Sequence, residues 1–164
     1  MKTLMSFEDG ADEPRWVAVN DGVMGGRSQG GTEVAGGLLR FSGVLSLENN
    51  GGFSSARTVG REFDFSGASA VVLRVRGDGR RYQLRLATDA SFRGITVSWG
   101  SEFPTLAGQW TEVRVPLAEL RPSVRGVALK GPPMEPSRVR ELGLLLGDKR
   151  EGPFQLEVDW IGLE

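Results

Sequence analysis

The sequence predicts an all-β protein, an antiparallel sandwich of jelly-roll type. Short segments alternate apolar and polar residues, as in residues 39–47, where Leu39, Phe41, Leu45 and Leu47 share one side. Glycines and prolines separate these segments, and no segment shows a convincing helical period. Short alternating strands joined by such turns are typical of two packed antiparallel sheets.

The expected strands follow these alternating segments along the chain. A first strand over residues 3–8 has Phe7 as its anchor, and residues 16–19 form a short extended segment before a glycine-rich loop. In residues 154–160, Phe154 and Trp160 lie on one face, because they are separated by an even number of positions. Further strands are expected over residues 39–47, 53–59, 94–99, 110–117 and 141–146.

The clearest local prediction is a hairpin over residues 71–87 with residues 77–80 as its loop. Its inward pairs are all apolar, which makes the register self-consistent: Val75 with Tyr82, Leu73 with Leu84, and Val71 with Leu86. On the outward face the same register opposes Arg76 and Arg81, which is unfavourable without a negative group nearby. That group is either an acidic side chain from a neighbouring strand or an anionic or hydroxyl-rich ligand.

The predicted core combines this hairpin with the last two strands. Its members are Leu73, Val75, Leu84, Leu86, Leu144, Leu156 and Val158.

Composition indicates one globular domain over residues 1–164, with 39% hydrophobic and 25% charged residues. The net charge of -1 gives no electrostatic reason to expect nucleic acid or an anionic membrane as partner. The absence of cysteine and histidine excludes disulfides, thiolate chemistry and Ser-His-Asp catalysis. No apolar run approaches a membrane span and no secretory signal is recognised, so we expect a cytoplasmic protein.

Two glycine-framed loops, in residues 16–28 and 47–53, leave apolar strands through paired polar residues. These polar residues, Asn20 with Asp21 and Asn49 with Asn50, either cap the turns or contact a partner. Both interpretations stay open.

We expect the two loops to meet at one end of the sandwich and to form one surface. A salt bridge between Asp21 and Arg57 is the predicted interaction that orders them. Met24, between glycines, is an adaptable apolar tip suited to a protein contact.

Residues 16–28 and 47–53 resemble the two signature stretches of the mitochondrial complex I intermediate-associated protein 30 family. Residues 73–79, followed by Tyr82, resemble its third signature, and residues 110–117 and 152–161 extend the similarity over nearly the whole chain. The resemblance implies a galactose-binding-like jelly-roll fold. Mitochondrial members are assembly factors for respiratory complex I that act as chaperone-like binding proteins, and this short chain is similar to the bacterial, single-domain branch.

The resemblance therefore implies a non-enzymatic protein whose partner is a respiratory-complex subunit or an assembly intermediate. The expected contact residues are Asn20, Asp21, Met24, Asn49, Asn50, Arg57, Arg76 and Arg81. The alternative is a carbohydrate-binding module-like domain that binds a sugar or glycan. That function requires exposed aromatic side chains on the concave face, for which the candidates are Tyr82, Phe92, Trp99 and Trp110.

No enzyme motif stands out, because no carboxylates are paired by sequence pattern and no phosphate-binding glycine loop precedes a helix. We expect no cofactor, with a structural calcium ion as the alternative. Related jelly-roll modules bind calcium where the first and last strands meet, and Glu8 and Asp159 would supply oxygen ligands there.

Overall fold

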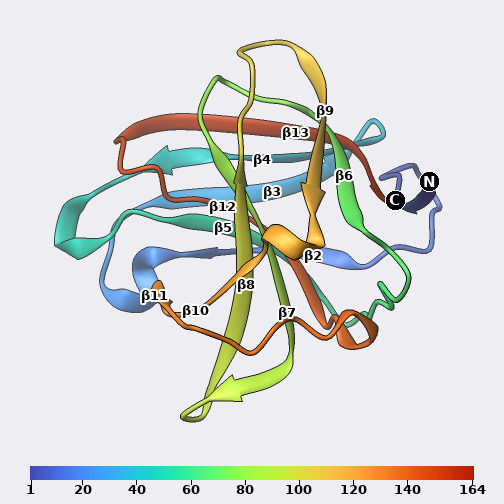
Figure 1. Ribbon diagram of the computed structural model, residues 1–164. Coiled ribbons are helices and arrows are strands. Elements are labelled where there is room, and N and C mark those ends of the chain that lie inside the picture. The colour runs from blue at the N-terminus through green and yellow to red at the C-terminus, as the bar shows by residue number, and fades with distance from the viewer.

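The computed structural model covers residues 1–164 and describes every side chain except those of Val23, Met24 and Asn50. Nearly all of its regular structure is extended (Figure 1). The strands are β1 (Lys2–Met5), β2 (Arg15–Asn20), β3 (Gln29–Ala35), β4 (Leu38–Leu45), β5 (Ser54–Val59), β6 (Ala70–Arg76), β7 (Tyr82–Phe92), β8 (Ile95–Phe103), β9 (Trp110–Pro116), β10 (Arg121–Val124), β11 (Val127–Ala128), β12 (Glu141–Leu146) and β13 (Gly152–Leu163). Short 3₁₀ turns are η1 (Asp21–Met24), η2 (Glu48–Asn50), η3 (Leu117–Glu119) and η4 (Pro136–Arg138).

Two antiparallel sheets pack face to face, which confirms the predicted all-β jelly-roll sandwich. The first sheet has the strand order β3-β4-β13-β6-β9, and β1 also pairs with β13. The second has the order β11-β10-β8-β7-β12-β5-β2. The two chain ends lie side by side (Figure 1), because β1 pairs with the C-terminal part of β13.

Every residue of the predicted core is buried between the sheets. The exposed fraction of each is at most 1%: Leu73, Val75, Leu84, Leu86, Leu144, Leu156 and Val158. The period-two alternation therefore identified correctly which side chains point inward.

The predicted hairpin over residues 71–87 is wrong. β6 lies in the first sheet, where Val75 pairs with Val158 and Thr111. β7 lies in the second sheet, where Leu84 pairs with Leu144 and Ser101. The chain thus crosses from one sheet to the other between residues 76 and 82. The inward side chains of β6 and β7 face each other across the sandwich, and the two strands are not hydrogen-bonded to each other.

A buried polar network fixes this crossing. Asp78 accepts hydrogen bonds from the Tyr82 hydroxyl (3.0 Å) and from the Gln155 backbone N–H (2.9 Å). The guanidinium of Arg80, 7% exposed, binds both carboxylate oxygens of Asp148 at 2.7 and 2.8 Å. Burial, together with the charge of Asp78, raises the pKa of Tyr82 well above its ordinary value, so Tyr82 stays a neutral donor.

The third signature therefore has a structural role. Gly77 is required there, because a Cβ at this position would lie 2.4 Å from Thr105 Oγ1. That hydroxyl donates to the Arg80 carbonyl at 2.7 Å and accepts from the Gly79 N–H at 3.1 Å.

The sequence did not predict β3, because its two glycines weaken the strand pattern. The strand forms because it can pair closely with β4 along the edge of the first sheet. A Cβ at Gly43 would lie 1.9 Å from the backbone carbonyl oxygen of Gln29, so the glycine permits the approach of the two strands.

Truncating Leu84 tests the buried side of β7. Because this side chain is fully buried between the sheets, Leu84→Ala should lower the free energy of unfolding by roughly 2–5 kcal/mol in denaturant titrations. The matched control is Val127→Ala, at a position 67% exposed, which should change it by less than about 0.5 kcal/mol. Equal effects of the two substitutions would contradict the placement of β7.

Candidate functional site

The two glycine loops meet at one end of the sandwich, where the carboxylate of Asp21 joins them. Asp21 is 1% exposed. Its Oδ1 accepts from the Ser28 backbone N–H at 2.8 Å, within its own loop. Its Oδ2 accepts from the Gly52 N–H at 2.6 Å and the Phe53 N–H at 3.3 Å, in the second loop. One buried side chain therefore holds both loops together.

Ser28 completes this junction. Its hydroxyl donates to Asp21 Oδ2 at 2.6 Å and accepts from the Ser46 N–H at 2.9 Å. Sequence reasoning missed Ser28, although it lies inside the first signature stretch. Its buried hydroxyl connects the carboxylate to the end of β4.

Glycines surround the carboxylate because the backbone approaches it too closely for any side chain. A Cβ at Gly26 would lie 2.5 Å from Asp21 Oδ1, and a Cβ at Gly51 would lie 2.5 Å from Asp21 Oδ2. Gly25 takes a left-handed backbone with φ of 89°, which ends η1. One glycine of each signature, Gly26 in the first and Gly51 in the second, thus leaves room for the same buried group.

The electrostatics of Asp21 follow from these donors. Burial by itself raises the pKa of Asp21, but hydrogen bonds from Ser28, Gly52 and Phe53 outweigh it and hold the pKa below its ordinary value of 3.8. The carboxylate is therefore ionised at neutral pH.

The predicted salt bridge between Asp21 and Arg57 is wrong. Arg57 lies on β5 and points to the outer face of the second sheet, where its Nε donates to Ser55 Oγ at 3.1 Å. Its nearest carboxylate is that of Glu141, with 4.0 Å between Nη1 and Oε1. Neutral N–H and O–H donors replace the expected cation at Asp21.

The asparagines of the two loops differ in their surroundings. The Asn20 side chain donates to the Gly30 carbonyl at 3.2 Å and accepts from the Ser54 hydroxyl, so it links strands of the two sheets. Asn49 is exposed and takes the left-handed backbone conformation, with φ of 55° and ψ of 39°. Met24 and Asn50 lie outside the described side chains.

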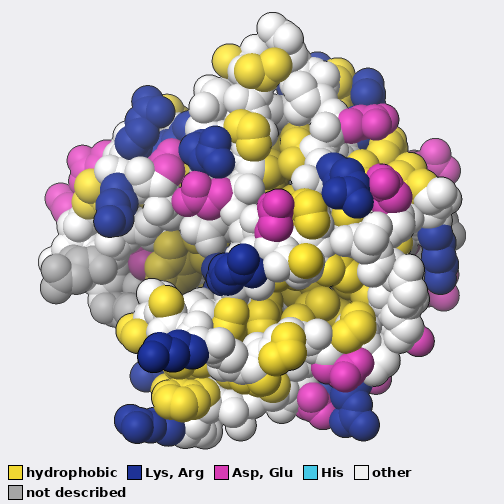
Figure 2. Space-filling view, in the orientation of Figure 1, with side chains coloured by type: hydrophobic (Ala, Val, Ile, Leu, Met, Phe, Trp, Pro, Cys, Tyr) yellow, Lys and Arg dark blue, Asp and Glu magenta, His cyan; other side chains and the backbone are white. Residues whose placement is uncertain are grey.

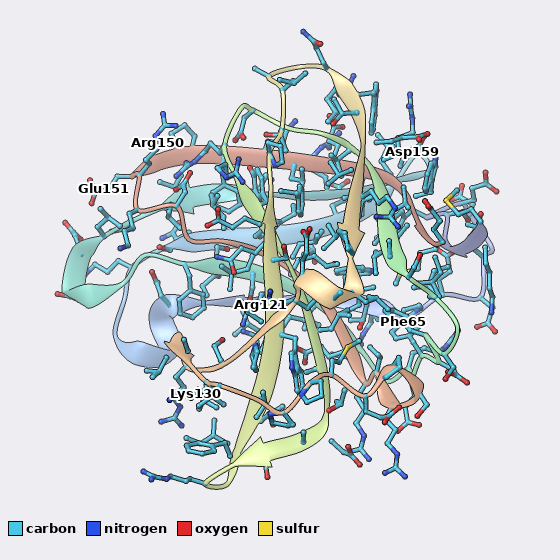
Figure 3. All side chains as sticks on the ribbon, viewed as in Figure 1. Phe65, Arg121, Lys130, Arg150, Glu151 and Asp159 are labelled. Atoms are coloured by element: carbon cyan, nitrogen blue, oxygen red, sulfur yellow. The ribbon has the colours of Figure 1, made fainter. Side chains whose placement is uncertain are left out.

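We call the surface formed by residues 21–28, 47–53 and 148–151 the loop end; it lies at the left of Figure 1. Leu47, an apolar residue of the loop end, is 39% exposed, and its backbone N–H donates to Glu151 at 3.0 Å. Figure 3 shows Arg150 and Glu151 on this side of the molecule. Arg27 and Glu48 form an exposed ion pair, 3.7 Å apart.

Arg76 and Arg81 are not opposed, because their strands belong to different sheets. Arg76 binds Glu157 at 2.8 Å and lies over the ring of Trp110, 4.8 Å from its centroid. Arg81 pairs with Glu102 at 3.1 Å. An acidic residue from a neighbouring strand thus faces each arginine, as one of the two interpretations expected.

The two candidate calcium ligands have separate surroundings. Asp159 on β13 pairs with Arg74 at 3.2 Å, and Figure 3 shows it at the side of the molecule where the chain ends lie. Glu8 is exposed in the loop after β1. Within the described part of the chain, no three acidic side chains gather closely enough to hold a metal ion. The calcium site stays a prediction.

Two of the four aromatic candidates for sugar stacking are buried, and arginine side chains lie over the rings of the other two. Tyr82 and Trp99 are buried in the core. Trp110 lies on the first sheet beneath Arg74 and Arg76, and Phe92 lies at the end of β7 beneath Arg93. Figure 2 shows charges of both signs interspersed over the visible face and hydrophobic side chains gathered in the lower half of the view.

Comparison with solved structures shows that the fold is a β-sandwich similar to those of carbohydrate-binding modules. The family 11 carbohydrate-binding module of the Clostridium thermocellum cellulase Lic26A-Cel5E superposes with a TM-score of 0.68 at 13% identity, covering 99% of this chain and 92% of that one. A non-crystalline-cellulose-specific module, CBM28, gives a TM-score of 0.57 at 14% identity, covering 100% and 94%. At such identities the likeness concerns the fold.

Sequence comparison defines the family. The family model for complex I intermediate-associated protein 30 matches residues 5–158, and the chain belongs to this family. The mouse mitochondrial protein of that name is 28% identical over 187 aligned residues, covering 99% of this chain and 56% of the relative. The Drosophila melanogaster protein is 30% identical over 110 residues, covering 62% and 36%.

The chain thus spans about half the length, or less, of these curated relatives. Their names place them in mitochondria, and the cytoplasmic location expected for this chain stays a prediction. Among the described residues, no helix has the length and hydrophobicity to cross a membrane.

Replacing Asp21 tests the loop junction. Asp21→Asn keeps the shape of the side chain but places an amide N–H₂ where backbone donors require an acceptor. We expect a loss of about 1–3 kcal/mol in the free energy of unfolding at pH 7. Asp12→Asn, which alters a carboxylate 97% exposed, is the control and should cost less than about 1 kcal/mol.

The pH dependence of this loss has a defined sign. Because the folded-state pKa of Asp21 lies below its ordinary value of 3.8, its contribution is complete well above that value and declines as the pH falls through the folded-state pKa. The stability difference between the wild type and Asp21→Asn should therefore shrink below about pH 4. A difference that stays constant from pH 7 to pH 3 would show that Asp21 does not act as a buried carboxylate.

Proposed function

We propose that this chain is a protein-binding domain that acts in the assembly of a respiratory complex and contacts its partner through the loop end. Membership of the complex I intermediate-associated protein 30 family supports the assembly role. The partner would be a respiratory-complex subunit or an assembly intermediate. We further propose that the domain is non-enzymatic, since its buried carboxylates Asp21 and Glu157 and the half-buried Asp148 all serve structural contacts.

The observation that carries the proposal is the preordered backbone of the loop end. Asp21 fixes both loops from beneath, so their exposed side chains are held in position before a partner arrives. Preordering lowers the conformational entropy lost on binding. Leu47 then presents an apolar contact with Arg27, Glu48 and Glu151 nearby, an arrangement suited to a small protein interface.

The sugar-binding alternative is supported by the fold alone. Sugar modules stack aromatic side chains on sugar rings, whereas two aromatic candidates of this chain are buried and arginine side chains lie over the rings of the other two. Protein binding is therefore the function that the surface supports better.

Capture of the partner from the extract of the source cells tests the proposal. The tagged wild-type chain should recover respiratory complex I subunits or assembly intermediates, identified by mass spectrometry. Leu47→Asp should reduce that recovery at least tenfold, because it places a charge in the apolar contact. Asn49→Gly, which keeps the left-handed backbone but removes the side chain, should also weaken it.

Val127→Asp is the matched control, since this residue is 67% exposed and lies on β11. It should leave recovery unchanged. All three variants should melt within a few degrees of the wild type. Recovery that is insensitive to both loop changes would contradict the assignment of the contact to the loop end, and recovery of no respiratory protein would contradict the assembly role.

A further inference from the structure

A cavity of about 320 Å³ lies between edge strands of the two sheets. β2 is at one edge of the second sheet and β3 is at one edge of the first, and the segment between β1 and β2 completes the wall. The cavity adjoins Arg15, which begins β2, whereas Asn20 ends the same strand beside the loop end. The cavity and the loop end therefore lie at opposite ends of β2. Its volume reaches the lower limit that is usual for ligand pockets.

The floor of the cavity is apolar and continuous with the core. Phe7 and Trp16 are both buried, and their ring centroids are 6.2 Å apart. Val34 lies on the face of β3 that it shares with Gly30, where a Cβ would collide with the Ser54 hydroxyl of the second sheet. That face therefore points into the sandwich, yet Val34 is 50% exposed. The sandwich is thus left open at an inner position of β3.

The carboxylate of Glu13 holds the wall of the cavity in place. Its Oε1 accepts from the Phe7 N–H at 2.8 Å, and its Oε2 accepts from the Ser6 N–H at 2.7 Å and the Ser6 hydroxyl at 3.1 Å. Phe7 has a left-handed backbone with φ of 60°, which is rare for a bulky residue and is found most often at functional sites. The wall is therefore ordered before any ligand enters, which lowers the entropy lost on binding.

The charged residues of the cavity are predominantly acidic. Among the described residues, the charged members of the lining are Glu8, Glu13 and Arg15, which together carry a net charge of -1. Two further acids lie in the same segment. Asp12 pairs with Arg61 at 2.9 Å and adds no net charge, whereas Asp9 is exposed and adds one more negative charge. The electrostatic environment therefore favours a cation over an anion.

The wall also contains a hydrogen-bond donor without an acceptor. Trp16 lines the cavity and is 7% exposed, and its indole N–H has no partner in the part of the chain that the structure describes. Buried polar groups nearly always have a partner in folded proteins. The backbone carbonyl groups of a bound polypeptide are acceptors of the kind that this donor requires.

A second, smaller cavity provides a contrast. It has a volume of about 150 Å³, and its charges are paired within the chain. Arg138 binds Asp89 at 3.0 Å, and Arg140 binds Glu62 at 3.5 Å. Its lining therefore has no excess of negative charge to offer a ligand.

We propose that the larger cavity binds an arginine side chain of a partner protein. The aliphatic stem lies against Trp16 and Val34, and the guanidinium lies beside the carboxylates of Glu8 and Glu13. A net charge of -1 in the lining matches a monocation. Arginine fits better than lysine, because its guanidinium is more weakly hydrated and forms hydrogen bonds with two carboxylates at once. The protein source of the arginine rests on the function proposed above.

An arginine-containing peptide tests the site directly. The acetylated, amidated peptide Gly-Arg-Gly, titrated at low salt, should saturably shift the indole N–H NMR signal of Trp16. The indole signal of Trp99, whose N–H donates to the Pro132 carbonyl at 3.0 Å, should not move. The norleucine version of the peptide, which keeps an aliphatic stem but has no charge, should bind about tenfold more weakly, and the lysine version should also bind more weakly.

Three variants locate the peptide on the protein. Glu8→Gln should weaken the affinity about threefold, because it removes an exposed charge. Val34→Phe, which fills the open inner position of β3, should abolish the shift of the Trp16 signal. The matched control is Glu119→Gln, at an exposed position in η3, which follows β9 at the opposite edge of the first sheet and should leave the affinity unchanged. All three should melt within a few degrees of the wild type.

The wild-type protein alone can overturn the proposal. No saturable shift of the Trp16 signal would contradict the site, equal affinity for the arginine and norleucine peptides would contradict a cation, and tighter binding of the lysine peptide would contradict arginine. The test is separate from that of the assembly role. Peptide binding without capture of respiratory proteins would contradict that role alone, and capture without peptide binding would contradict the cavity assignment alone.

Discussion

A buried carboxylate without a cation is the constraint on which the loop end depends. Asp21 is ionised, yet its ligands are backbone N–H groups and one hydroxyl. Such a group requires several donors at once, because an ionised carboxylate deprived of them would be strongly destabilised in the protein interior. The positions of Ser28, Gly52 and Phe53 are therefore fixed together, and the glycines beside them follow from the space that the carboxylate occupies.

The same principle operates at the crossing between the sheets. Asp78 and Asp148 hold residues 77–82 through Tyr82 and Arg80, so two more acidic side chains fix irregular backbone. Carboxylates therefore hold all three segments that resemble family signatures; Asp21 is buried, and Asp78 and Asp148 are half-buried.

Sequence reasoning succeeded for features that are determined by residues close together in the chain. Period-two alternation identified the core side of β13 up to Val158, but a bulge after Val158 buries Ile161, so the prediction that Trp160 shares the face of Phe154 is wrong. The left-handed backbone of Asn49 agrees with the turn-forming tendency of asparagine. Sequence reasoning failed for strand pairings and side-chain contacts between residues that are distant in the chain. The apolar pattern of residues 71–87 fits a hairpin and a crossing equally well, since both direct Val75 and Leu84 inward. Opposite charge favoured Arg57 as the partner of Asp21, whereas the true partners are the Ser28 hydroxyl and backbone N–H groups. The backbone groups carry no signal in the residue types.

Hydrogen exchange at the loop junction tests the central claim most directly. If the Asp21 carboxylate makes the two loops one unit, the amides of Ser28, in the first loop, and Gly52, in the second, should be protected from exchange with the same opening free energy. Both should lose protection together in Asp21→Asn. Free exchange of the Gly52 amide in the wild-type protein, with Ser28 still protected, would show that the loops open independently and would contradict the account.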